Sequence, residues 1–284
     1  MRGNSQRGIA LVMVLWGVTL LALLAAGLAG TSGLAARRMG HAIEAAEAHA
    51  ALETAAAAAE LALADTDPGK SWRADGTRHH VALDVGEAEI AASSEAGKID
   101  LNHAPPPLLR GLFDRAAASP AEADRLFAAF SAWTTPGSGG RALLAVSELA
   151  ALPGIGVETY RRLIRSSTVH NESGRLAWRL ADVETLSAIP GVTDQARAGL
   201  LAAKGRKDYT PDVETAQAFA AAGVTEDSAG PDAAAPLYVT LEIAVHLPTH
   251  AAASAEALVR LAPREQHPVT ILEWHEPRWQ EENR

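Results

Sequence analysis

Apolar positions fill the start of the chain almost without interruption. Residues 9–36 contain no charged side chain, and Arg2 and Arg7 precede them. A stretch of about 20 apolar residues is long enough to cross the hydrocarbon core of a bilayer as a helix. Positive charge on the leading side predicts that the N-terminus stays in the cytoplasm. The pattern therefore predicts a transmembrane helix over residues 9–36 and export of everything after Arg37.

The apolar pattern then becomes amphipathic. Over residues 37–68 apolar side chains recur at helical spacing with glutamates between them, and no proline interrupts the pattern before Pro68. One helix is therefore expected over Ile9–Ala64. A cleaved secretory signal is the alternative, since small residues at 26–33 offer a cleavage site. Such a signal has no use for the amphipathic continuation.

Alternating apolar and polar residues predict strands in two separate regions. In residues 69–98, Val81, Leu83 and Val85 share one face, and a turn at Gly86 suggests two short antiparallel strands. In residues 226–277, three segments are rich in strand-forming residues and are separated by polar or proline-containing loops. These segments are LYVTLEIAVHL (Leu237–Leu247), AEALVRLAP (Ala255–Pro263) and HPVTILEWHEP (His267–Pro277).

The residues between these two regions have a helical pattern. The expected fold class is α+β: a long N-terminal transmembrane and amphipathic helix packs on a small antiparallel sheet, and an all-α domain of residues 99–225 is inserted between the early and late strands. Residues 205–232, rich in Gly, Pro, Asp and Ala, are expected to form the return linker. Residues 278–284 form a C-terminal tail.

Two pieces of the inserted domain share the helix-hairpin-helix pattern, in which a helix ends at an apolar residue and is followed by Pro-Gly, an apolar residue and a second helix. They are ELAALPGIGVETYRRLI (Glu148–Ile164) and VETLSAIPGVTDQARAGLL (Val183–Leu201). The second has Thr193 where the second glycine would stand. The expected turn residues are Pro153, Gly154, Ile155, Gly156, Pro190 and Gly191.

These hairpins have two interpretations. As a DNA clamp, the backbone amides of Ile155 to Val157 would hold a phosphate, with Arg161, Arg162 and Arg165 adding positive charge. As a structural unit, the turn packs two short helices through Leu149, Leu152, Ile155 and Ile164. The formal net charge of −9 opposes DNA binding, because phosphate neutralisation normally needs a basic face. The structural interpretation is favoured.

Composition argues against catalysis. The chain has no cysteine, which excludes disulfides, thiolate nucleophiles and cysteine-ligated zinc, and it has neither a G-x-S-x-G nor an H-E-x-x-H motif. Adjacent His79 and His80 would point to opposite faces of a strand. No catalytic residue and no cofactor are therefore expected. Calcium is an open alternative, for which two acidic sets offer oxygens: Asp208, Asp212 and Glu214, or Glu226, Asp227 and Asp232.

The sequence QRGIALVMVLW resembles the processing site of type IV pilins and type II secretion pseudopilins. In that family a short basic leader ends in glycine, and the helix that follows remains in the mature protein. The resemblance implies that residues 1–8 are a leader, that prepilin peptidase cleaves after Gly8, and that Ile9 becomes a methylated N-terminus. Most such proteins carry a glutamate at the fifth mature position, where this chain has Met13.

The missing glutamate is typical of one minor pseudopilin, the general secretion pathway protein K family. GKIDLNHAPPPLLRGLF (Gly97–Phe113) resembles the segment that leads into the helical domain of that family, with Asp100 at the first asparagine position and Asn102 kept. Asn102 is expected to cap or bracket the turn before the next helix. The resemblance covers nearly the whole chain.

This resemblance implies a non-enzymatic subunit at the tip of the type II secretion pseudopilus, which starts pseudopilus assembly and assists protein secretion across the outer membrane. The implied partners are the other minor pseudopilins, the major pseudopilin and prepilin peptidase. The implied location is the inner membrane, with the C-terminal part in the periplasm. The alternative is a membrane-anchored helix-hairpin-helix DNA receptor of a DNA-uptake system, although such receptors are short and basic.

Overall fold

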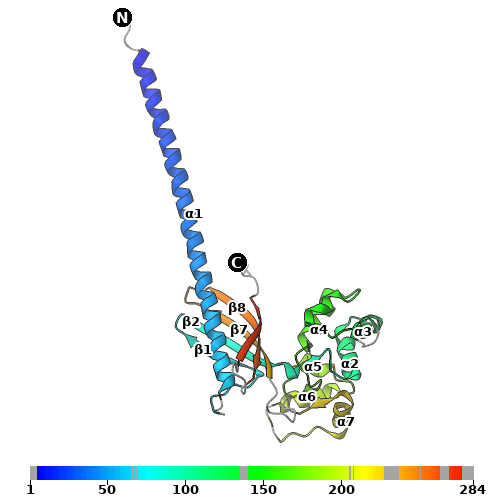
Figure 1. The fold of residues 1–284 in the computed structure, drawn as a ribbon. Coiled ribbons are helices and arrows are strands. Elements are labelled where there is room, and N and C mark those ends of the chain that lie inside the picture. The colour runs from blue at the N-terminus through cyan, green and yellow to red at the C-terminus, as the bar shows by residue number, and fades with distance from the viewer. Residues whose placement is uncertain are drawn as a thin grey trace.

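A long helix, a sheet and a separate helical lobe make up the protein (Figure 1). The computed structural model describes residues 5–65, 67, 69–134, 140–204, 206, 208–226, 237–249, 251–262 and 269–276. Side chains of the first helix are described at 11–23 and from 38 onward. Helix α1 (Ser5–Ala64) projects far from the sheet as a rod, and its C-terminal part lies across one face of the sheet.

The sheet joins strands from both ends of the chain. Its order is β1-β2-β7-β8-β9, and every neighbouring pair is antiparallel. The strands are β1 (Asp75–Leu83), β2 (Gly86–Ser94), β7 (Leu237–His246), β8 (Ala252–Leu261) and β9 (Val269–His275). Strand β8 begins before the expected Ala255, because pairing of Ala252 with His246 extends the β7 ladder over residues of weak strand propensity.

Alanines let α1 approach the sheet closely. The buried side of α1 is formed almost entirely by alanine, with Leu52 as the one large side chain among its buried described residues. Opposite it, alternate residues of the central strands fill the core, as the two-residue period of a strand requires. The members of this core on β7 and β8 are Val239, Leu241, Ile243, Val245, Ala255, Ala257, Val259 and Leu261.

The inserted lobe has its own core, around Trp178, Phe113 and Phe130. The chain enters it through the 3₁₀ turn η1 (Glu95–Gly97). The lobe contains β3 (Ile99–Asp100), α2 (Pro106–Ala116), α3 (Pro120–Thr134), η2 (Val146–Ala151), α4 (Val157–Ser166), β4 (Ser167–Thr168), β5 (Leu176–Ala177), α5 (Val183–Ser187), α6 (Asp194–Ala203), α7 (Val213–Ala222) and β6 (Val224–Thr225). It is not purely helical, because β3–β4 and β5–β6 form two short parallel pairs.

Helix α7 occupies part of the expected return linker. The Asp212 carboxylate accepts a hydrogen bond from the amide of Thr215 at 2.8 Å and so caps the start of α7. Gly223, at φ +69°, ends the helix in the left-handed region. These two local signals, together with burial of Phe219 against the lobe core, produce a helix where composition suggested a linker.

The expectation of a transmembrane helix over residues 9–36 is wrong for the described residues. Within the residues that the structure describes, no helix is both long and apolar enough to span a bilayer. The fold class is therefore a long N-terminal helix on a five-stranded antiparallel sheet with an inserted lobe. The inner-membrane location stays a prediction.

Candidate functional site

The N-terminal part of α1 presents apolar side chains on all sides. Over residues 11–23 every described side chain is exposed, including Leu11, Trp16 and Leu23. Isolated chains rarely expose contiguous apolar surface of this extent, and such surface marks a contact site for another apolar body. Met13, at the position where pilins carry glutamate, is 71% exposed and adds no charge to this surface. The segment is therefore the first candidate interaction surface.

The expected processing residues lie at the start of the same helix. The backbone of α1 is helical from Ser5 and passes through Gly8 and Ile9. The side-chain environment of Gly8 and Ile9 lies outside the described residues. Cleavage after Gly8 and methylation of Ile9 stay predictions.

The first hairpin turn has the geometry expected from its Pro-Gly sequence. Gly154 lies in the left-handed region at φ +75°, and the amide of Ile155 donates a hydrogen bond to the carbonyl of Leu152 at 3.2 Å. Gly156 is then the N-cap of α4. The helix before Pro153 is a 3₁₀ helix. On α4 the buried apolar residue is Leu163, whereas the expected Ile164 faces a cleft between the lobes.

The second hairpin repeats this geometry. Gly191 lies at φ +83°, and the amide of Val192 donates to the carbonyl of Ile189 at 3.4 Å. Thr193, at the position of Gly156, is the N-cap of α6, and its hydroxyl accepts from the amide of Ala196 at 3.2 Å. The threonine therefore replaces the glycine without loss, because this position needs an N-cap with an extended backbone and no positive φ.

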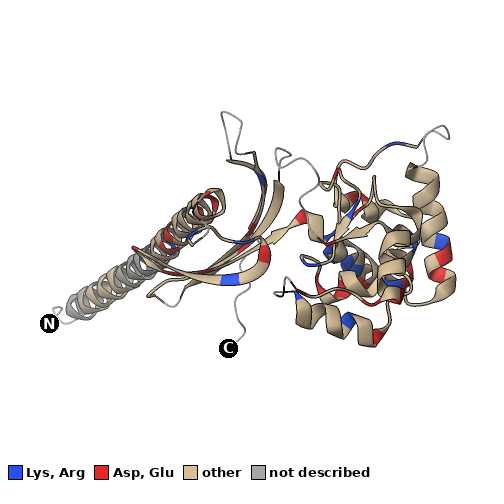
Figure 2. Ribbon diagram, turned by 90° about the horizontal axis from the view of Figure 1, so that it is seen from below, with Lys and Arg blue, Asp and Glu red and all other residues tan. Residues whose placement is uncertain are grey.

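Acidic side chains neutralise the arginines of the first hairpin. Arg161 and Arg162 both lie near the Glu158 carboxylate, at 3.8 and 3.6 Å, and Arg165 lies 3.9 Å from Glu184. Glu158 stands in the first turn of α4, beside the amides that a phosphate would need. Figure 2 shows Lys and Arg interspersed with Asp and Glu over the inserted lobe. Among the residues of the lobe that the structure describes, no basic face of the kind that a nucleic-acid clamp needs is formed.

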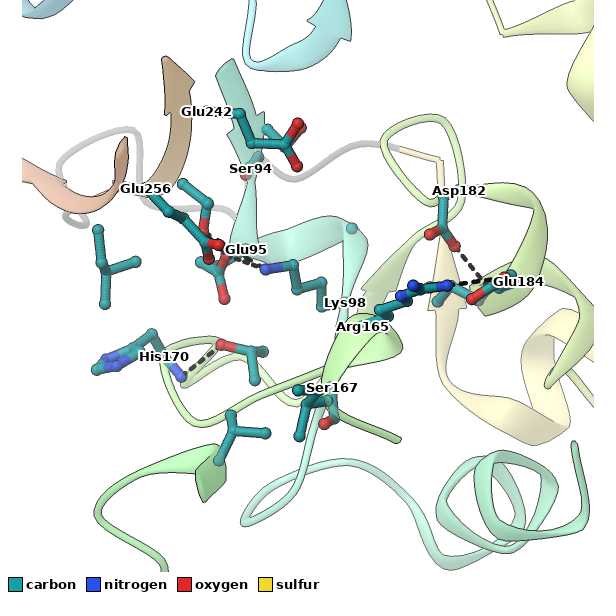
Figure 3. A pocket seen from close by; sticks show the side chains of 18 of the residues that line it. Ser94, Glu95, Lys98, Arg165, Ser167, His170, Asp182, Glu184, Glu242 and Glu256 are labelled. Atoms are coloured by element: carbon teal, nitrogen blue, oxygen red, sulfur yellow. Dashed lines mark hydrogen bonds and ion pairs between the residues drawn. The ribbon is translucent and has the colours of Figure 1, made fainter. Parts of the chain in front are cut away.

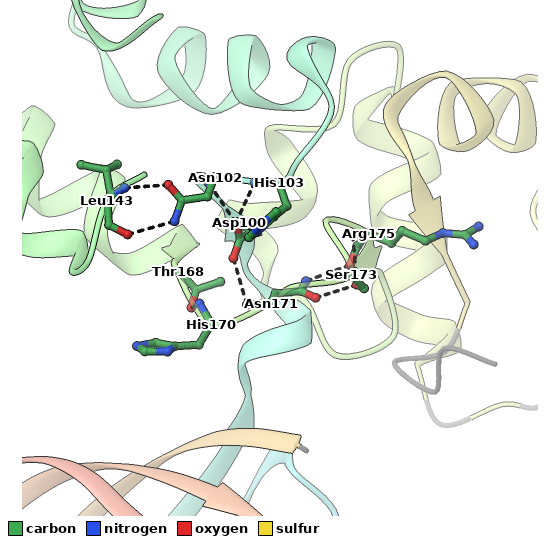
Figure 4. Close-up of polar contacts among 9 residues, drawn as sticks. All are labelled: Asp100, Asn102, His103, Leu143, Thr168, His170, Asn171, Ser173 and Arg175. Carbon is green, nitrogen blue, oxygen red and sulfur yellow. Dashed lines mark hydrogen bonds and ion pairs between the residues drawn. The ribbon is translucent and has the colours of Figure 1, made fainter. Parts of the chain in front are cut away.

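The segment that leads into the lobe is organised by a buried carboxylate (Figure 4). Asp100 is 1% exposed. Its Oδ1 accepts from the amides of Asn102 and His103, both at 2.8 Å, and lies 3.0 Å from His103 Nδ1. Its Oδ2 accepts from the amide of Asn171 at 2.9 Å. One side chain thus ties the turn before α2 to the loop after β4, and a carboxylate supplies all these acceptor positions.

Asn102 brackets a distant segment and does not cap α2. Its Nδ2 donates to the carbonyl of Leu143 at 3.0 Å, and its Oδ1 accepts from the Leu143 amide at 2.8 Å. Helix α2 has Pro105 as its N-cap residue, without a side-chain cap. Of the two expected roles of Asn102, the structure therefore shows bracketing: the side-chain amide holds the backbone of Leu143, ahead of the first hairpin.

Three of the six calcium candidates, Asp208, Asp212 and Glu226, have protein partners. Asp208 pairs with Arg206 at 3.2 Å, which lowers the pKa of the Asp208 carboxyl, and Glu226 pairs with Arg179. Asp212 caps α7, and the Thr215 amide lowers the pKa of its carboxyl. Among the described residues no group of three acidic or histidine side chains is arranged to hold a metal. Asp227 and Asp232 lie outside the described residues, and Glu214 is in the first turn of α7.

The two adjacent histidines have separate environments. His79 stacks on Trp72 with ring centroids 4.0 Å apart, on the face of the sheet that α1 covers. His80 is exposed, with its Nε2 4.0 Å from Glu89. They do not form a shared site.

Arg179 connects several segments of the inserted lobe, and the sequence pattern does not single it out. Its guanidinium lies 4.5 Å from the centroid of the buried Trp178 ring and donates to carbonyls at the end of α6, including Ala203 at 3.1 Å. It also donates to Glu226. A cation in the apolar stretch LAWRLAD was the available signal, since a charge in such a context needs several partners.

No protein-family model matches the sequence, and a comparison with curated proteins finds no similar one. Among solved structures, the fold is similar to that of a chain in the crystal structure of the GspK–GspI–GspJ complex from the enterotoxigenic Escherichia coli type 2 secretion system. The TM-score is 0.52 at 15% sequence identity, over 85% of this chain and 98% of that chain. The long helix, the antiparallel sheet and the inserted lobe together therefore give this chain a pseudopilin-like fold.

Proposed function

We propose that the chain is a minor pseudopilin of a type II secretion system, and that it works as a structural subunit without catalysis of its own. The observation that carries the proposal is the fold shared with a chain of the GspK–GspI–GspJ complex. The exposed apolar surface of α1 supports it, because such a surface suits packing among the helices of neighbouring subunits. Gly17 and Ala22 on this surface permit close helix approach. Other minor pseudopilins and the major pseudopilin are the proposed partners.

We further propose a position at the tip, where the subunit starts pseudopilus assembly. A glutamate at the fifth mature position would pair its carboxylate with the N-terminal amine of a neighbouring subunit. Met13 has no charge and cannot form this pair. The inserted lobe stands beside the sheet as a bulky addition, away from the α1 rod (Figure 1). Both features suit a subunit that has no neighbour above it.

Processing of the leader tests the family assignment. Replacing Gly8 with alanine is expected to abolish cleavage by prepilin peptidase, because the peptidase requires the glycine before the scissile bond. Mass spectrometry of the N-terminus measures this. Gly17→Ala is the matched control: a Cβ at Gly17 meets no atom within 4 Å, and cleavage after Gly8 should continue. Cleavage of the wild type by signal peptidase within residues 26–33 would overturn the proposal.

The tip position has its own test. The sequence has no cysteine, so Val213→Cys gives a single thiol, at a position that is 75% exposed on the inserted lobe. Gold-labelled pseudopili are expected to carry label at one end in electron micrographs, whereas a labelled cysteine in the major pseudopilin should decorate the whole length. Label from Val213→Cys scattered along the fibre would exclude the tip.

The DNA-receptor alternative predicts salt-sensitive, micromolar binding of duplex DNA that is lost in Arg161→Ala and Arg162→Ala. We expect no such binding, because Glu158 lies close to both arginines. Fluorescence anisotropy with a short labelled duplex measures it. Binding that depends on both arginines would replace the secretion proposal with the receptor one.

A further inference from the structure

We propose that a cleft between the sheet and the inserted lobe binds an arginine side chain, carried on an extended segment of a partner protein, between Glu242 and Glu256. The proposal does not depend on which protein supplies the segment. It also holds if the chain belongs to another kind of assembly. Its basis is an uncompensated pair of like charges at the floor of a formed cleft.

The cleft has a volume of about 750 Å³ and is open to solvent. Its floor is the face of the sheet that α1 does not cover, and its opposite wall is formed by α4 and α5 of the lobe. Figure 3 shows Glu242 and Glu256 on the sheet side, with Arg165, Asp182 and Glu184 across from them. The volume falls within the roughly 300–1,000 Å³ of typical ligand sites. It is large enough for a side chain with its flanking backbone.

Glu242 and Glu256 lie directly opposite each other in the β7–β8 ladder. Both side chains are exposed on the uncovered face. Residues paired in this way have Cβ atoms about 5 Å apart, and like charges at such a pair destabilise a sheet. Repulsion between these two carboxylates therefore lowers the stability of the sheet, and folding of the chain does not require either of them.

The other carboxylates of the cleft all have partners. Glu95, buried at the junction of sheet and lobe, accepts from Lys98 Nζ at 2.7 Å and from the Thr240 hydroxyl at 2.6 Å. Glu184 pairs with Arg165, and Asp182 caps α5. Glu273 lies 3.2 Å from Nε2 of His275, the residue opposite Glu256 on β9.

Glu242 and Glu256 therefore stand apart within the cleft. Among the residues that the structure describes, neither carboxylate has a hydrogen-bond or ion-pair partner. The nearby cations have other carboxylates as partners: Lys98 lies at Glu95, Arg165 at Glu184, and Arg78, which lines a hollow beside both glutamates, at Glu89. His275, opposite Glu256 on β9, lies at Glu273. A cationic ligand would therefore supply the charge that this pair does not receive from a direct partner.

The opposite wall holds a second unpaired group. The hydroxyl oxygen of Thr185 is buried and has no hydrogen-bond partner in the described part of the chain, and Thr185 lines the same cleft. The residue is only 1% exposed. A buried hydroxyl without a partner loses hydrogen-bond free energy, which a ligand can restore once a small movement of the wall uncovers the oxygen. An extended segment offers backbone amides and carbonyls for this purpose.

Guanidinium fits the carboxylate pair better than a metal ion does. Calcium takes six to eight oxygen ligands, and no group of three candidate ligands is found among the described residues. A guanidinium carries five donors in a plane and can bond two carboxylates at once. It also removes the repulsion between them. The ligand class is therefore a peptide that presents arginine.

Two measurements on the full chain test this. Glu242→Gln and Glu256→Gln are each expected to raise the midpoint of urea unfolding, since either removes the like-charge repulsion. In NMR titrations, acetyl-Ala-Ala-Arg-Ala-Ala-amide should shift amides of β7 and β8. The citrulline analogue, which has the same shape without the charge, should bind roughly tenfold more weakly. Either Gln variant should lose the preference for arginine.

Glu87→Gln is the matched control, because Glu87 is exposed on the same sheet face but outside the cleft. It should leave both the unfolding midpoint and peptide binding unchanged. The proposal is overturned by equal binding of the arginine and citrulline peptides, by absence of binding, or by Gln variants at Glu242 and Glu256 that are no more stable than Glu87→Gln.

Discussion

Replacing Asp100 with alanine is expected to lower the free energy of unfolding of the inserted lobe by about 3 kcal/mol or more. The buried carboxylate accepts hydrogen bonds from the backbone amides of Asn102, His103 and Asn171, and the substitution leaves all three without their acceptor. Urea denaturation followed by tryptophan fluorescence measures the loss, since Trp178 is buried in the lobe core.

Asp100→Asn is the informative companion. It keeps one carbonyl oxygen and the size of the side chain, so it should recover part of the lost stability. The amides bonded to the oxygen that the amide nitrogen replaces should stay without an acceptor. Asp124→Ala provides a control on charge alone, because Asp124 is exposed and paired only with Arg110 at the surface. If Asp100→Ala unfolds at the same urea concentration as Asp124→Ala, the carboxylate is not what holds the lead-in segment.

Replacing Gly111 with alanine is expected to destabilise the lobe by about 2–3 kcal/mol. A Cβ at this position of α2 would lie 2.0 Å from the carbonyl oxygen of Ala188, which ends α5 in the second hairpin. The Cβ position is fixed by the backbone of α2, and the atom it meets is a backbone carbonyl, so no side-chain rotation relieves the clash. The urea midpoint of the variant measures the cost.

Gly199→Ala is the paired control on α6. A Cβ there would lie 3.5 Å from the Tyr209 hydroxyl, an ordinary contact, so the substitution should stabilise the lobe by about 0.5–1 kcal/mol through helix propensity. Opposite signs for the two variants identify close packing of α2 on the second hairpin. Two stabilising results would mean that α2 and the hairpin are not in contact.

The periodicity of apolar residues predicted those parts of the fold that depend on short segments of sequence. The spacing in α1 and the alternation in β1 and β7 are properties of short segments, so these elements lie where the sequence places them. The Pro-Gly turns were also readable, because Gly154 and Gly191 supply a positive φ that other residues rarely adopt.

Contacts between distant segments determine the features of the fold that could not be predicted from sequence. The start of β8 depends on its alignment with β7, and the short strands β3 and β4 exist only because two distant segments meet. The partners of Arg179 come from α6 and from Glu226, far along the chain. No local pattern contains such contacts.

Of the two candidate interaction surfaces, one could be predicted from the sequence and the other could not. The exposed apolar part of α1 follows from composition, although the expectation that it forms a bilayer span was wrong for the described residues. The cleft that contains Glu242 and Glu256 could not be predicted, because its floor and walls come from segments that only the folded sheet and lobe bring together. A pair of glutamates on two strands becomes unusual only once the register is known.

Co-assembly is the most direct test of the central claim, that this chain is a minor pseudopilin. The full chain is co-expressed with the other minor pseudopilins of its own secretion system, and an affinity tag on one of those partners is used for purification, followed by native mass spectrometry. The account predicts a stable complex that contains this chain. Recovery of the partners as a complex without this chain, while it remains alone in the unbound fraction, would contradict the account.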